Sequence, residues 1–129
     1  MGQMQPVRTG ATILVVEDEA LISEMVAEAL EERGFDVFVA SNAAAALEYL
    51  ASGAQVDALF TDVHLPGGMS GSELASRVRS LRPEMPIVYA SGQWRPTEHE
   101  QLVSRSVFLP KPYDPRDAGT LLMRLVKMH

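Results

Sequence analysis

The chain has 129 residues, which suits a single domain with one core, and 47% of them are hydrophobic, which excludes a disordered chain. It has no cysteine, so disulfides and thiolate chemistry are excluded, and a net charge of −6 without a lysine or arginine cluster disfavours direct nucleic-acid binding. No apolar run reaches the roughly 20 residues of a membrane span and the N-terminus lacks the apolar core of a signal peptide, so we expect a cytoplasmic protein.

The first half of the chain alternates between strand-like and helical patterns. The aliphatic run Thr12–Val16 predicts a strand covered on both faces, and apolar residues at helical spacing predict a helix over 19–33. A second strand is predicted over Phe35–Ala40. An alanine-rich helix follows it, with Ser41 or Asn42 as the residue that caps its first turn.

The second half of the chain repeats this alternation. Strands are predicted over Val56–Thr61, Pro86–Ala90 and Ser106–Pro110. A helix between the first two begins at a capping box of Ser70 and Glu73, and a last helix begins near Asp114. Residues 95–104 are only weakly helical, so a helix there is predicted to be short or mobile.

Five strands that alternate with helices predict an α/β fold with a parallel sheet and helices on both of its faces. We see no linker within the chain and no second domain. We therefore expect one domain over residues 11–129, preceded by an N-terminal tail over residues 1–10.

Polar residues stand where several of these strands end. They are Glu17 and Asp18 after the first strand, Asp62 after the third, Ser91 after the fourth and Lys111 after the fifth. In an open parallel sheet these ends meet at the edge where ligands bind. Clustered carboxylates repel one another, and hard oxygen ligands of this kind suit Mg²⁺. A carboxylate beside a metal ion and an ammonium group can also act as a nucleophile toward phosphorus.

Four sequence motifs together resemble the receiver domain of two-component response regulators. They are "VVEDE", "TDVHLPGGMSG", "YASG" and "FLPKPY", and they follow the first, third and fourth strands and cover the fifth. The resemblance covers roughly residues 11 to 127. It implies a flavodoxin-like, doubly wound (βα)5 sandwich whose five-stranded parallel sheet has the order 2-1-3-4-5.

The resemblance also implies a role for each residue at the sheet edge. Asp62 matches the phosphoacceptor, and Lys111 matches the lysine that pairs with the phosphoryl group. Mg²⁺, or Mn²⁺ in its place, is expected on Glu17, Asp18, Asp62 and the backbone carbonyl of His64. Ser91 matches the hydroxyl residue that follows the phosphoryl group, and Phe108 takes the place of the aromatic switch residue.

Receiver domains take a phosphoryl group from a histidine kinase or a histidine phosphotransfer protein, and they catalyse only their own phosphorylation and dephosphorylation. The resemblance therefore implies a signalling protein rather than an enzyme. Phosphorylation would alter the face formed by residues 95–104, the strand Ser106–Pro110 and the last helix, and so change protein contacts. Neither nucleic acid nor membrane is expected as a direct partner.

Two details of the motifs point to particular kinds of receiver. "YASGQW" resembles the Phe-Ala-Thr-Gly-x-Tyr motif of a subclass in which the helix before the fifth strand is reduced or dynamic. "PGGMSG" has one glycine more than chemotaxis-type receivers and resembles receivers attached to hybrid kinases. A single-domain receiver and a domain of a hybrid kinase both fit these motifs.

Two other functions are alternatives to a phosphorylated receiver. A degenerate receiver would bind partners without phosphoryl chemistry, but the set of residues from Glu17 to Lys111 is complete. A phosphatase with an aspartyl nucleophile would have a second acid two residues after it as the proton donor. Here His64 stands at that position, which disfavours the phosphatase.

Overall fold

The structure, a computed structural model, describes residues 8–92 and 105–127. Five parallel strands form one sheet in the order β2-β1-β3-β4-β5, as predicted. The strands are β1 (Thr12–Val16), β2 (Asp36–Ala40), β3 (Ala58–Asp62), β4 (Ile87–Ser91) and β5 (Ser106–Pro110). The described part of the chain contains four helices, α1 (Ala20–Glu32), α2 (Ala43–Ala51), α3 (Gly71–Leu81) and α4 (Pro115–Lys127). The short or mobile helix predicted at residues 95–104 lies outside the described residues.

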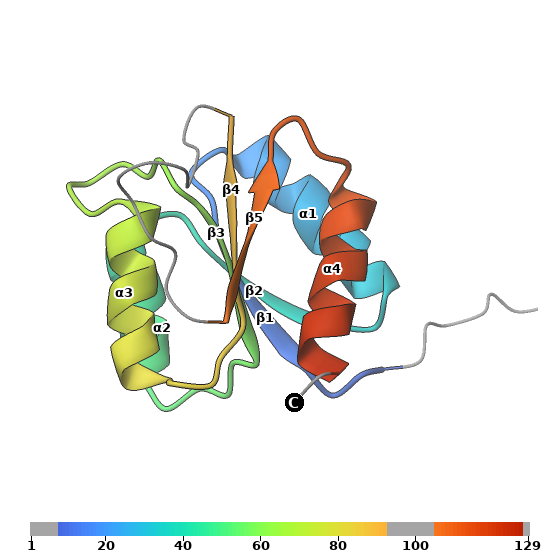
Figure 1. The fold of residues 1–129 in the computed structure, drawn as a ribbon, viewed down its shortest axis with the longest axis horizontal. Coiled ribbons are helices and arrows are strands. Elements are labelled where there is room, and N and C mark those ends of the chain that lie inside the picture. The colour runs from blue at the N-terminus through green and yellow to red at the C-terminus, as the bar shows by residue number, and fades with distance from the viewer. Residues whose placement is uncertain (1–7, 93–104, 128–129) are drawn as a thin grey trace, which may run out of the picture.

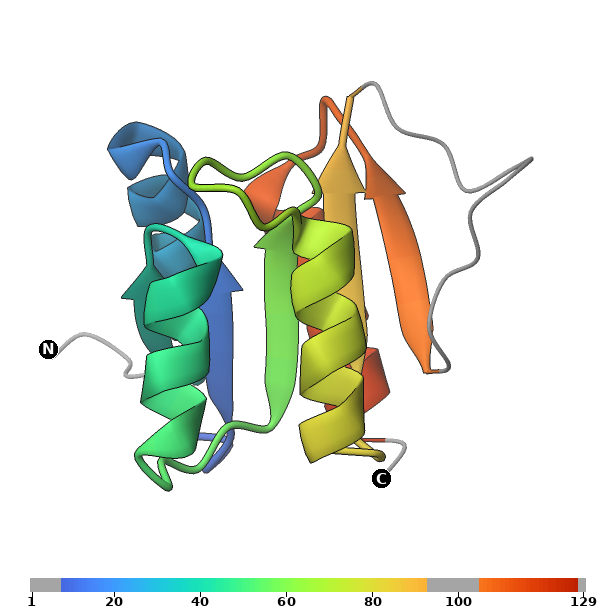
Figure 2. The same ribbon diagram turned by 90° about the vertical axis from the view of Figure 1, so that its left-hand side faces the viewer.

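The helices cover both faces of the sheet (Figure 1). Helices α1 and α4 pack on one face and α2 and α3 on the other, and Figure 2 shows the latter two in front of the strands. Each face has its own buried cluster. One contains Ile13, Val15 and Phe60, and the other contains Leu14, Leu59 and Tyr89. The alternation of neighbouring residues between the two clusters is the period-2 pattern of a sheet buried on both sides.

Side chains at the helix starts agree with the capping predictions. The side chain of Asn42 accepts a hydrogen bond from the N–H of Ala45, and the hydroxyl of Ser70 accepts one from the N–H of Glu73. Helix α4 begins after Asp114, whose carboxylate accepts from the N–H of Arg116 at 2.9 Å. These bonds satisfy amide groups that a helix leaves free in its first turn.

The bounds of three strands differ from the sequence prediction. The second strand begins at Asp36 rather than at Phe35. The sequence predicts a third strand over Val56–Thr61, but the strand runs from Ala58 to Asp62. It is preceded by Asp57, whose carboxylate accepts a hydrogen bond from the N–H of Thr12 at 2.7 Å and whose own N–H donates to the carbonyl of Thr12. The fourth strand runs from Ile87 to Ser91 rather than from Pro86 to Ala90. Ser91 is therefore the last residue of β4, and Asp62 is the last residue of β3.

Candidate functional site

The register of the sheet brings the predicted site residues to one edge. Val16 of β1 pairs with Thr61 of β3, so the residues that follow them, Glu17 and Asp62, lie on neighbouring strand ends. Asp62 pairs in turn with Ala90 of β4. Adjacent strands in a sheet are about 4.8 Å apart, so this pairing alone sets the spacing of the side chains at the edge.

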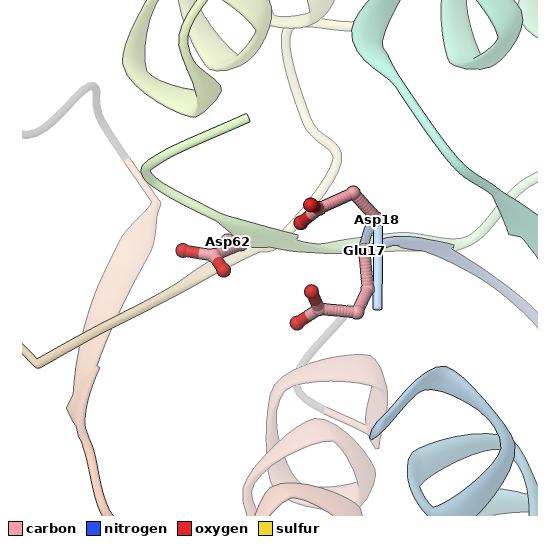
Figure 3. A group of neighbouring side chains, drawn as sticks. All are labelled: Glu17, Asp18 and Asp62. Atoms are coloured by element: carbon pink, nitrogen blue, oxygen red, sulfur yellow. The ribbon is translucent and has the colours of Figure 1, made fainter. Parts of the chain in front are cut away.

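Three carboxylates meet at this edge (Figure 3). Glu17, Asp18 and Asp62 each offer an oxygen, and these oxygens all lie within 4.8 Å of one another. Glu17 and Asp62 are buried, whereas Asp18 is exposed. Two charges at that separation repel by about 3 kcal/mol at an effective dielectric constant near 20. Three ionised carboxylates therefore need nearby positive charge, and their hard oxygens suit a divalent cation.

Glu17 is held in a buried position that disfavours its charge. Its side chain is on the face of the sheet that carries α1 and α4, and one of its oxygens accepts a hydrogen bond from the N–H of Glu19 at 3.1 Å. Burial raises the pKa of Glu17 above its ordinary value, and repulsion by Asp62 acts in the same direction. The uncharged form of the Glu17 carboxyl is thus favoured more than it is in an exposed glutamate.

Lys111 supplies the positive charge that reaches the central carboxylate. Its ammonium nitrogen donates to Asp62 Oδ2 at 2.9 Å, and the side chains of lysine and aspartate are 29% and 8% exposed. Burial lowers the pKa of Lys111, but the hydrogen bond to Asp62 and the charge of that carboxylate outweigh it, so the pKa is raised overall. The lysine is therefore charged at neutral pH. It follows β5 directly, where a cis peptide bond joins it to Pro112.

The other predicted site residues lie around Asp62. The N–H of His64 donates to Asp62 Oδ1 at 3.1 Å, so each oxygen of the acceptor carboxylate has a donor. Ser91 is fully buried at the end of β4, and its carbonyl accepts from the N–H of Lys111 at 3.0 Å. Phe108 lies in β5, half-buried against the cluster under α2 and α3.

The structure places two residues at the site to which the sequence pattern assigns no role. A Cβ atom on Gly71, the first residue of α3, would lie 2.0 Å from the carbonyl oxygen of Asp62. Tyr113 follows Lys111 by two residues, and its buried hydroxyl lies close enough to Glu17 and Asp62 for their charges to raise its pKa, although burial is the larger cause. Both residues stand in the quoted motifs, but spacing in a sequence does not reveal close backbone approach or an unpaired hydroxyl.

The sheet order, together with acids and a lysine at one edge, defines a receiver-type signalling domain. The sequence matches the family described as response regulator receiver domain over residues 13–122, and the chain belongs to this family. In the described residues no helix is long and apolar enough to cross a membrane.

Relatives of the chain include regulators and a kinase that are much longer. It is 35% identical over 108 residues to the DNA-binding transcriptional regulator NtrC of Rhizobium meliloti, covering 82% of this chain and 22% of that protein. It is 30% identical over 120 residues to the sensor kinase CckA of Brucella abortus, covering 91% of this chain and 13% of that protein. The chain thus spans less than a quarter of each of these two relatives.

A solved structure of similar size also matches. The response regulator receiver protein of Sinorhizobium medicae is 33% identical, with a TM-score of 0.85, and the match covers 92% of this chain and 96% of that one. The similarity therefore extends over nearly the whole of both chains.

Proposed function

We propose that this chain is the phosphoacceptor of a two-component phosphorelay and that Asp62 is the residue that receives the phosphoryl group. The observation that carries the proposal is the convergence of Lys111 and of two further carboxylates on the carboxylate of Asp62. Asp62 is buried, yet it stands at the edge of the sheet where ligands of such folds bind. A salt bridge made only for stability would not need two more acids beside it.

The residues present fit a divalent cation, Mg²⁺ or Mn²⁺. Oxygens of Glu17, Asp18 and Asp62 lie within 4.8 Å of one another, and the backbone carbonyl of His64 is the fourth ligand that we propose. Burial raises the pKa of Glu17, and a bound cation would favour its ionised form. When bound, the metal ion supplies positive charge that stabilises the oxygens of the phosphoryl group in transfer.

The transfer itself is a substitution at phosphorus. One oxygen of Asp62 forms a bond to the phosphorus of a phosphohistidine, and the P–N bond breaks with its electron pair leaving on the imidazole, which then takes a proton. Lys111 neutralises charge on the phosphoryl oxygens, and Ser91 donates a hydrogen bond to one of them. Hydrolysis later returns Asp62 to a carboxylate and releases inorganic phosphate.

The signal is a shift between two packings of the same fold. The phosphoryl group adds negative charge and acceptor oxygens, which draw Ser91 toward Asp62. Phe108 then moves into the space behind Ser91, and the surface of β5 and α4 changes with it. Phe108 has no hydroxyl, so its switch works by packing alone.

The partners follow from this role. We propose a histidine kinase or a histidine phosphotransfer protein as phosphodonor, in the cytoplasm, and a downstream protein that reads the switched face. Residues 11–129 form the receiver domain in this proposal, with residues 1–10 as a tail. The DNA-binding function in the name of the NtrC relative is not extended to this chain, which spans only 22% of that protein.

The test is the intact mass of the protein after incubation with Mg²⁺ and a small phosphodonor. We expect one added phosphoryl group in the wild type and in Asp36→Asn, an exposed aspartate at the start of β2. No adduct should form in Asp62→Asn or without a divalent cation. If no adduct forms, binding of beryllofluoride, a stable mimic of the phosphoryl group, decides the case. A protein that binds neither is a degenerate receiver, and the proposal is then wrong.

A further inference from the structure

Tyr113 holds a buried hydroxyl without a hydrogen-bond partner. Among the side chains that the structure describes, it is the buried polar atom for which no partner is found. A buried hydroxyl without a partner costs about 1–3 kcal/mol, and phenylalanine would avoid this cost. The hydrogen bonds within the described fold therefore do not account for this hydroxyl.

The ring of Tyr113 lies on the same face of the sheet as Glu17. It packs edge-on against Phe60 of β3, with ring centroids 5.7 Å apart and planes at 70°. Phe60 lies two residues before Asp62, so the two side chains leave the strand on one face. Glu17 shares this face because it follows Val15 by two residues, and Figure 3 shows its carboxylate on the side of α1 and α4.

The negative charges of the site act on the hydroxyl of Tyr113. Burial raises the pKa of Tyr113, and the negative charges of Glu17 and Asp62 raise it further, with Glu17 the stronger of the two. Tyr113 is therefore a hydrogen-bond donor at neutral pH. It also lines a cavity of about 480 Å³ next to Lys111, whose other lining residues are apolar and include Ile22, Met25 and Val26 of α1. The donor thus stands beside buried carboxylates in surroundings with few competing acceptors.

We propose that Tyr113 is a positioning residue whose hydroxyl donates a hydrogen bond to the carboxylate of Glu17 when a divalent cation binds at the acidic cluster. The inference rests on the metal site of the proposed function. Glu17 accepts one backbone hydrogen bond in the metal-free structure, and an ionised carboxylate can accept more. A second donor holds the buried anion in one orientation, and losing such a partner typically weakens metal binding by about 10–100-fold.

The experiment compares the wild type with Tyr113→Phe and with Tyr49→Phe, a control that removes a hydroxyl from a tyrosine stacked on Phe38 and packed against the cluster of the opposite face of the sheet. Mg²⁺ alone is titrated by calorimetry, without a phosphodonor. We expect Tyr113→Phe to bind Mg²⁺ about tenfold more weakly and Tyr49→Phe to bind as the wild type does. Without metal, Tyr113→Phe should unfold at the same temperature as the wild type or at a higher one.

A spectroscopic signal separates positioning from a structural role. A phenol that begins to donate to a carboxylate changes its ultraviolet absorption, so Mg²⁺ should produce a tyrosine difference spectrum that Tyr113→Phe lacks and Tyr49→Phe retains. Equal Mg²⁺ affinity in the wild type and Tyr113→Phe would overturn the inference, as would a lower metal-free stability with unchanged affinity. If the wild type itself binds no Mg²⁺, the metal site of the proposed function is wrong and this inference is wrong with it.

Discussion

Replacing Gly71 by alanine tests how closely α3 approaches the acceptor strand. Gly71 is the first residue of α3, and its N–H donates to the carbonyl of Val63 at 2.7 Å. An added Cβ would lie 2.0 Å from the carbonyl oxygen of Asp62 and 2.8 Å from its carbonyl carbon. The atoms in the way belong to the backbone, so no side-chain rotation can relieve the overlap.

The expected loss of stability can be estimated from opposing effects. Overpacking costs about 1–3 kcal/mol, and an overlap with backbone belongs at the upper end, about 3 kcal/mol. Alanine gains about 1 kcal/mol over glycine inside a helix. The free energy of unfolding should therefore fall by about 2 kcal/mol, which lowers the melting temperature by roughly 8 °C for a domain of this size.

The assay is thermal unfolding of Gly71→Ala beside Gly119→Ala. Gly119 lies in α4, and the atoms nearest to its added Cβ would belong to the flexible side chain of Arg33, at 3.3 Å. This control should change the free energy of unfolding by no more than about 1 kcal/mol, because Arg33 can move aside. If Gly71→Ala melts at or above the wild-type temperature, the close approach of α3 to Asp62 is wrong. Equal losses in both variants would contradict a specific clash between residue 71 and the backbone of Asp62.

Three further predictions concern the charges of the site. Burial raises the folded-state pKa of Glu17, so the free energy of unfolding falls as pH rises from about 4.5 through that pKa. Glu17→Gln should therefore stabilise the metal-free protein more at pH 7.5 than at pH 5 in urea unfolding, whereas exposed Glu28→Gln should show no such difference. Asp18→Asn should weaken Mg²⁺ binding about tenfold or more in calorimetry, and unchanged affinity would exclude Asp18 as a ligand. Lys111→Met should slow phosphoryl incorporation from a small phosphodonor about 100-fold or more by intact mass, while exposed Lys127→Met should react at the wild-type rate.

Much of the fold can be predicted from the sequence because local signals and burial agree. The predicted strand Ser106–Pro110 has the observed bounds, and side-chain chemistry alone indicates the cap at Ser70 and narrows the cap of α2 to Ser41 or Asn42, of which the structure shows Asn42. The predicted start of the third strand is wrong because Val56 favours strands, whereas Asp57 is held by its hydrogen bond to Thr12. A single sequence does not reveal that a residue from a distant strand provides this partner.

Part of the candidate site can likewise be predicted from the sequence, and part cannot. Carboxylates and a lysine at strand ends are visible as residue types, so the sequence alone singles out Asp62 and Lys111. It assigns no role to Gly71 and Tyr113, because one acts through the Cβ atom that it lacks and the other through a hydroxyl whose surroundings depend on three elements. The tyrosine that follows Lys-Pro is the signal that could have pointed to such a role, since a purely apolar position would not need a polar group.

The parallel register described for β1, β3 and β4 also decides where the chain can change its length. The spacing between strands sets the distances between the side chains of the site. This spacing does not depend on how many residues connect one strand to the next. Additions on the far side of the sheet, such as the turn after α2, should leave the distances around Asp62 unchanged. Deleting one residue inside β3 would instead send the acceptor carboxylate to the opposite face. Tolerance to insertion and deletion should therefore be high in the connections opposite the site and nearly absent within the three central strands.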